Sequence, residues 1–231
     1  MPERQGSGLV ISYLTLRQMI GILGVSLPVL VVAGAGVISA VEIRPSISAY
    51  YYSNMRDLFV GILCMVGVFL ISYKGYDRLD HYTSNVSGIL AIVVALFPTH
   101  GEEGRIAVGI FQLDDGLSGK VHDVCASLLF VSLAFISTFL FTKTKSVVTM
   151  TERKKIRNQV YRICGAIMFG ALLVAFVFSL PALSRTAPRH LVLAVETVCL
   201  WAFGVSWLVK GETILTDERS PIFFFESHPH V

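Results

Sequence analysis

The sequence predicts an all-α fold, a polytopic integral membrane protein built as a bundle of six transmembrane helices. Hydrophobic residues make up 54% of the 231 positions and charged residues 15%, whereas a soluble domain carries about 25% charged residues. The hydrophobic residues also form six long runs, and a run of about 18 apolar residues can cross a bilayer as a helix. The sequence lacks the alternating ten-residue pattern of barrel strands, so helices are the structure that pairs every backbone N–H and C=O in hydrocarbon.

Five of the runs contain no Lys, Arg, Asp, Glu or His, and the sixth contains Glu196 alone. The five are residues 18–41, 58–73, 82–99, 124–142 and 163–184, and the sixth is 191–209. These runs predict spans at about 19–40, 56–73, 83–99, 121–142, 160–183 and 189–209, in one domain over residues 1–210 that is followed by a tail over 211–231. The first run exceeds the apolar region of a cleavable signal, about 7 to 15 residues, so we expect it to stay in the mature protein.

The composition excludes several classes of soluble protein. A net charge of +3 is too small for a protein that binds nucleic-acid phosphates through a clustered basic face. The four cysteines, at positions 64, 125, 164 and 199, fall in four different spans, whereas disulfide frameworks staple water-exposed loops. We therefore expect membrane lipids, and no nucleic acid, as partners, and the sequence leaves an oligomer open.

The distribution of Lys and Arg predicts the orientation of the spans. Six spans put both chain ends on the same side, and that side holds 13 of the 19 Lys and Arg residues. Because loops rich in these residues stay in the cytoplasm, we predict a multi-pass protein of the inner (plasma) membrane with cytoplasmic N and C termini. The connection over 143–162 supplies seven of the 13, and we expect it to touch anionic lipid headgroups.

Ionisable residues gather at the opposite, outer side of the predicted bundle, where they form the candidate ligand-binding set. Arg56 and Asp57 begin the second span, His122 and Asp123 begin the fourth, and Glu196 lies inside the sixth. Ionisable groups within a span indicate a functional site, because an uncompensated charge in hydrocarbon is costly. Asp57 and Asp123 have a simpler explanation as well, since a carboxylate in the first turn of a helix satisfies free N–H groups.

Glu196 is the most informative member of this set. It lies seven residues beyond Arg189, or about 10 Å below the outer helix end at 1.5 Å per residue. We expect its carboxyl group to face the bundle interior and to be protonated or paired with a cation, for which Arg56, His122 and Arg189 are the candidates.

The leading functional interpretation is a binding protein with an outward-facing polar pocket for a lipid headgroup, an ion or a small ligand. In this pocket Glu196 anchors a cation or accepts a hydrogen bond from a headgroup. The guanidinium of Arg56 donates paired hydrogen bonds to a phosphate. Tyr50, Tyr51 and Tyr52 are expected at the membrane interface, where they frame the mouth of the pocket. A small transporter or channel is a further alternative, with little support because the sequence shows no pair of broken helices.

A membrane-embedded lipid hydrolase is the main alternative, so it is uncertain from the sequence whether the protein is an enzyme. The candidate catalytic residues are His122 as a metal ligand or general base and Glu196 as the acid. Asp123 or Asp57 would be a second ligand or would orient the histidine.

A divalent metal ion is the cofactor that these residue types allow, although no motif specifies one. A zinc hydrolase would use His100, His122, His190 and a carboxylate in a three-ligand open site. The connection over 100–123 adds two carboxylate pairs, at 102–103 and 114–115, which could gather a cation by oxygen ligation. Their spacing matches no EF-hand loop, so the cofactor stays undetermined.

The stretch RPSISAYYYSNMRDLFVGILCMVGVFL, over residues 44–70, resembles the DRAM, Frag and Sfk-type six-helix membrane proteins, in which an Ile-Ser turn precedes a helix with a polar start. The segments YKGYD, ALFPT, FLFTKT, RNQVYRICG and AFGVSWLVKGE are similar to segments of uncharacterised bacterial six-span inner-membrane proteins. This resemblance implies a six-helix bundle. In the eukaryotic relatives it implies roles in lipid-anchor remodelling and membrane regulation, and it implies no catalytic set.

Overall fold

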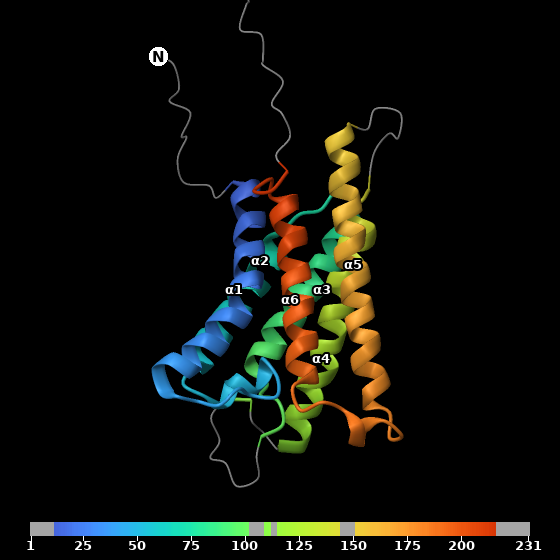
Figure 1. Cartoon of the computed structure of the whole chain (residues 1–231). Coiled ribbons are helices and arrows are strands. Elements are labelled where there is room, and N and C mark those ends of the chain that lie inside the picture. The colour runs from blue at the N-terminus through green and yellow to red at the C-terminus, as the bar shows by residue number, and fades with distance from the viewer. Residues whose placement is uncertain (1–11, 102–108, 112–114, 144–150, 216–231) are drawn as a thin grey trace, which may run out of the picture.

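A computed structural model describes residues 12–101, 109–111, 115–143 and 151–215, and this part of the chain contains helices and no strand (Figure 1). The long helices are α1 (Tyr13–Ser39), α2 (Arg56–Ser72), α3 (Arg78–Leu96), α4 (Asp115–Phe135), α5 (Glu152–Ser179) and α6 (Leu191–Lys210). The short elements are the 3₁₀ helices η1 (Ser48–Tyr52) and η3 (Ser184–Thr186), and the π-helical turn η2 (Ile136–Leu140) that continues α4. The predicted all-α class is confirmed.

In the part of the chain that the structure describes, five helical segments are long and apolar enough to cross a membrane. They are α1, α3, the continuous segment Gly116–Leu140, α5 and α6. The one remaining predicted span, over 56–73, corresponds to α2, which has 17 residues. At 1.5 Å per residue it measures about 26 Å, slightly less than the hydrocarbon core of roughly 30 Å. The structure thus supports a membrane-embedded helical protein with five clear candidate spans.

The six long helices form a closed ring in the order of the chain. Each packs against the next, and α1 closes the ring by packing against α6. In Figure 1, α1 and α5 flank α6, and α1, which contains Pro28, bends toward its C-terminal end. The start of α1 and the end of α6 lie at one end of the bundle, which we call the terminal end; the connection that holds η1 lies at the opposite end (Figure 1).

Side-chain caps set the starts of α1, α3 and α5, several residues before the corresponding apolar runs. Ser12, Asp77 and Thr151 each accept the backbone N–H of the residue three positions further on. Such caps satisfy N–H groups that have no partner within the helix. The three helices therefore extend beyond their apolar segments at the terminal end, and α5 reaches 28 residues.

Two glycine pairs allow neighbouring helices to approach closely. A Cβ added to Gly204 of α6 would lie 2.8 Å from the carbonyl oxygen of Gly21 in α1, and one added to Gly21 would lie 2.9 Å from that of Gly204. Between α2 and α3, Gly67 and Gly88 face each other in the same way, at 2.7 and 2.5 Å. Any larger side chain would push the two backbones apart, so these contacts depend on glycine.

Candidate functional site

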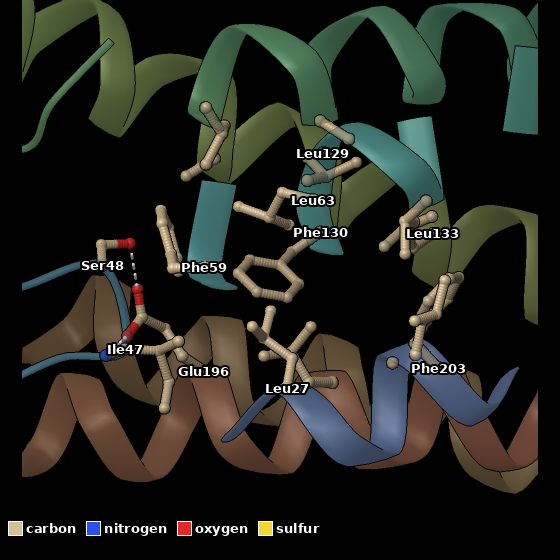
Figure 2. Close-up of a pocket in the computed structure, with 17 residues that line it drawn as sticks. Leu27, Ile47, Ser48, Phe59, Leu63, Leu129, Phe130, Leu133, Glu196 and Phe203 are labelled. Atoms are coloured by element: carbon tan, nitrogen blue, oxygen red, sulfur yellow. Dashed lines mark hydrogen bonds between the residues drawn. The ribbon is translucent and has the colours of Figure 1, made fainter. Parts of the chain in front are cut away.

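Glu196 lies in the second turn of α6, and only 9% of its surface is exposed. Its carboxyl group accepts two hydrogen bonds, from the backbone N–H of Ile47 at 2.5 Å and from the Ser48 hydroxyl at 3.0 Å (Figure 2). Both donors lie at the start of η1, where free N–H groups and the helix dipole favour an anion. Beside them, the N–H of Leu193 donates to the carbonyl oxygen of Pro45 at 2.9 Å. Glu196 and its neighbour thus fasten the α1–α2 connection to α6.

The cations that the sequence suggested as partners of Glu196 lie elsewhere. Arg189 is 3.9 Å from Glu42 in an exposed pair. The guanidinium of Arg56 lies 5.1 Å from the centre of an aromatic ring, and His122 bonds a backbone carbonyl oxygen at 2.8 Å. In the described part of the chain, N–H and O–H donors therefore compensate Glu196, and no cation pairs with it.

The remaining candidate residues differ in their exposure. Asp57 is exposed in the first turn of α2, where it meets the helix dipole. Asp123 lies 3.3 Å from His100, and both of these side chains are more than half exposed. His122, in contrast, is 2% exposed. The residues of the hydrolase hypothesis thus range from exposed to buried, and that hypothesis stays a prediction.

The described residues contain no group of three or more His, Cys, Asp or Glu side chains that could hold a metal ion. His190 is exposed next to the start of α6, and it does not join His100 and His122 in a zinc site. The carboxylate pairs at 102–103 and 114–115 lie outside the residues whose side chains the structure describes.

The tyrosines that precede α2 pack into the bundle to different extents. Tyr50 and Tyr51 are fully buried, and the Tyr52 hydroxyl donates to the carbonyl oxygen of Thr99 at 2.7 Å. The prediction that these rings frame the mouth of an outer pocket is therefore wrong for Tyr50 and Tyr51, whereas Tyr52 is half-buried. The two rings are buried because η1 folds into the bundle, where Glu196 holds its first residues.

A cavity lies inside the bundle next to η1, and we call it the chamber. Its volume is about 40 Å³, and it is lined by 17 residues from α1, α2, α3, α4, α6 and the η1 connection. Figure 2 shows Leu27 and Phe203 on one side of the chamber and Phe130 on the other. Among these 17, only Ser48 and Glu196 have polar side chains, and they are hydrogen-bonded to each other. The chamber is therefore an apolar space.

Sequence reasoning missed the roles of Ile47 and Ser48. One local signal was present, because the hydroxyl of Ser46, two residues before η1, accepts the backbone N–H of Ala49 at 2.9 Å, and serine favours turns of this kind. The hydrogen bond from Ile47 to Glu196 joins positions that are 149 residues apart. Such a contact leaves no local pattern in the sequence.

At the terminal end, the turn between α2 and α3 holds a small ion-pair network. Lys143 Nζ lies 2.7 Å from Asp77 and 2.5 Å from Asp80, and Asp80 is 4% exposed. The hydrogen bond from Lys143 holds the pKa of Asp77 below its usual range. Burial disfavours the charged form of Lys143, but the hydrogen bonds to the two carboxylates outweigh it and raise its pKa. The network joins the start of α3 to the segment that follows η2.

Comparison of the chain with models of protein families, with curated proteins and with solved structures finds no match. The resemblance to the DRAM, Frag and Sfk-type proteins therefore stays a prediction. The function has to be argued from the geometry of the site itself.

Proposed function

We propose that this chain is an integral protein of the inner (plasma) membrane that crosses the bilayer six times, has both ends in the cytoplasm, and binds the hydrocarbon part of a lipid in the chamber. The observation that carries the binding part is the apolar chamber, whose one acidic side chain, Glu196, is hydrogen-bonded to the η1 connection. The group that enters the site is thus a hydrocarbon chain, whereas the sequence suggested a headgroup, an ion or a small ligand.

The outward faces of the helices support embedding in a membrane. Large apolar side chains are exposed along α1, α4 and α5, among them Val37, Val124, Leu173 and Phe176. Water-soluble proteins rarely expose contiguous apolar surfaces of this kind. In a bilayer these side chains would face lipid acyl chains.

The position of α2 supports a sixth crossing despite its length. It packs between α1 and α3 and runs from the opposite end of the bundle to the terminal end (Figure 1). A bilayer accommodates a slightly short span by local thinning or by extension of flanking side chains. Six crossings put both chain ends on one side, and the excess of Lys and Arg assigns that side to the cytoplasm. The described part of the basic connection, 151–162, would then lie where it can meet anionic headgroups.

Labelling of single cysteines tests the crossing of α2. After the four native cysteines are changed to Ala, we expect Glu42→Cys to react with a membrane-impermeant maleimide in intact cells, and Lys74→Cys to react only after permeabilisation. Both positions are exposed and they flank α2. Ser184→Cys, also exposed, is the matched control and should behave as Glu42→Cys does. Equal labelling of the two test positions in intact cells would contradict six spans, and a reversed pattern would contradict the orientation.

The lining and the volume of the chamber indicate the chemistry of its ligand. A cavity of about 40 Å³ exceeds the roughly 10–15 Å³ that one water needs and is well below the roughly 150 Å³ of an engineered cavity that binds benzene. A polar ligand would lose its hydration without finding a free partner, because Ser48 and Glu196 already bond each other. The last few carbons of an acyl chain fit both limits.

Filling the chamber should displace that chain end. Ala126 of α4 lines the chamber, and Ala126→Leu adds three carbons to it. We reconstitute the protein in nanodiscs that contain phosphatidylcholine spin-labelled near the end of one acyl chain. The chamber holds the end of one acyl chain, and the larger side chain would take its place. We therefore expect Ala126→Leu to remove about one motionally restricted lipid per protein, while the lipids in the annulus around the bundle stay unchanged. The measurement is electron paramagnetic resonance.

The matched control is Ala166→Leu, which makes the same change on the exposed face of α5. It should leave the number of restricted lipids unchanged. If folded Ala126→Leu protein restricts as many labelled lipids as the unchanged protein does, the chamber is not the binding site.

A further inference from the structure

Lys210, the last residue of α6, is a buried cation at the terminal end. The residue is 7% exposed, and its Nζ lies 5.0, 4.9 and 5.9 Å from the ring centres of Tyr76, Phe141 and Tyr161. It makes no hydrogen bond or ion pair with any residue in the described ranges. The aromatic faces and the negative end of the α6 dipole stabilise the ammonium. They replace only part of the hydrogen bonding that its three N–H groups have in water.

This placement differs from that of most lysines at the ends of transmembrane helices. Such lysines keep their methylene groups against apolar surface and extend the charged group to water. Lys210 instead keeps its charge among rings that come from the α2–α3 turn, the end of η2 and α5. Burying an ammonium group without a hydrogen-bonding partner costs free energy. This cost points to an anion that pairs with Lys210 at this position.

Further charged residues act electrostatically on Lys210. Arg17 of α1 and Lys154 and Arg157 of α5 are charged neighbours, and Asp80 is an acidic one. Asp80 is already bonded within the ion-pair network of the α2–α3 turn. Among the described residues that act electrostatically on Lys210, cations therefore outnumber acids.

The side chains around this point are mainly hydrogen-bond donors. Arg17 and Arg157 are neighbours of the buried Tyr161. Arg157 lies 3.7 Å from Glu212, whereas neither Arg17 nor Lys210 pairs with a carboxylate among the residues that the structure describes. Ammonium and guanidinium groups donate only, and a phenol can donate as well. Among the described residues, the carboxylates of Asp80 and Glu212 already pair with other cations, so the ammonium of Lys210 has no acidic partner there.

We propose that Lys210, Arg17 and Tyr161 bind a phosphate group at the terminal end of the bundle, either in a lipid headgroup or as free inorganic phosphate. A phosphate carries negative charge on several acceptor oxygens, which matches a set of donors. The guanidinium of Arg17 provides a planar fork, and Lys210 provides a compact point charge. The site uses other residues than the chamber does, so it stands independently of acyl-chain binding.

The experiment measures the thermal unfolding of the full chain in dodecyl maltoside, a detergent without phosphate. Three probes are titrated at constant ionic strength: dioctanoyl phosphatidylglycerol, dioctanoylglycerol and inorganic phosphate. A ligand that binds only the folded state raises the melting temperature as its concentration rises. We expect dioctanoyl phosphatidylglycerol to raise it more than dioctanoylglycerol does. In Lys210→Met the apparent affinity for phosphatidylglycerol should fall at least about tenfold.

Lys210→Met keeps an apolar side chain of similar length against the three rings, so the variant should fold. Lys210→Arg should retain part of the binding because it retains the charge. Lys120→Met removes an exposed lysine outside the terminal end and should bind as the unchanged protein does.

The probes separate the two sources of phosphate. A rise with phosphatidylglycerol and none with inorganic phosphate assigns the site to a lipid headgroup, and a rise with both assigns it to phosphate itself. The proposal is overturned if neither phosphate probe raises the melting temperature, if dioctanoylglycerol gives an equal rise, or if Lys210→Met binds as tightly as the unchanged protein.

Discussion

Replacing Glu196 with Ala will destabilise the folded protein by about 3–5 kcal/mol, because it strips the start of η1 of its acceptor. The N–H of Ile47 and the hydroxyl of Ser48 would both lose their partner in a buried site. Each unsatisfied buried donor costs about 1–3 kcal/mol, and the lost side-chain volume adds to the chamber. Unfolding in mixed detergent micelles measures the change, and hydrogen exchange at the Ile47 amide reports the release of η1.

Two further variants separate the hydrogen bonds of Glu196 from general effects of mutation. Glu196→Gln keeps one acceptor and the shape of the side chain, so it should cost only about 1 kcal/mol. Glu42→Ala removes the acid of an exposed pair and should change stability by less than about 0.5 kcal/mol. If Glu196→Ala unfolds at the same denaturant concentration as the unchanged protein, the carboxyl group does not hold η1.

Replacing Gly204 with Val is expected to separate α1 from α6 and to cost at least about 3 kcal/mol. A Cβ at this position would lie 2.5 Å from the Val25 side chain and 2.8 Å from the Gly21 carbonyl oxygen, and the latter is backbone that cannot turn away. The contact between α1 and α6, which closes the ring of helices, would have to break. The yield of folded protein on size-exclusion chromatography and its unfolding curve measure the loss.

Gly170→Val is the matched control for this prediction. Gly170 is in the middle of α5, where an added Cβ would meet nothing within 4 Å. Valine has a higher helix propensity than glycine, so this variant should be as stable as the unchanged protein or slightly more stable. Equal stability of both valine variants would show that α1 and α6 do not rely on their glycine contact.

The sequence alone predicted the helices well and their ends less well. The apolar run over 163–184 begins inside α5, but α5 itself begins at Glu152, because Thr151 caps a basic segment that is helical before it becomes apolar. A run without charged residues identifies the part of a helix that can lie in the hydrocarbon core, whereas a cap residue identifies where the helix starts. The cap residues are visible in the sequence, so the starts of α1, α3 and α5 were within reach of a search for caps.

The candidate site was less predictable than the fold. The buried position of Glu196 follows from its place in an apolar run, and the structure buries it. The partners were expected among nearby cations, yet they are a backbone N–H and a hydroxyl from the η1 connection. Lys210 and its aromatic neighbours were absent from the candidates, because a lysine at the end of a span normally reaches water.

What the sequence determined by itself is that this chain is helical and apolar enough for a membrane, since charge-free runs and caps are properties of consecutive residues. Only the tertiary structure decided what Glu196 and Lys210 meet. Closing the ring of helices brings Ser48 to Glu196 across 148 positions, and it brings Tyr76 and Phe141 to Lys210. Contacts of this kind depend on how whole helices pack, and no local pattern of residues encodes that packing.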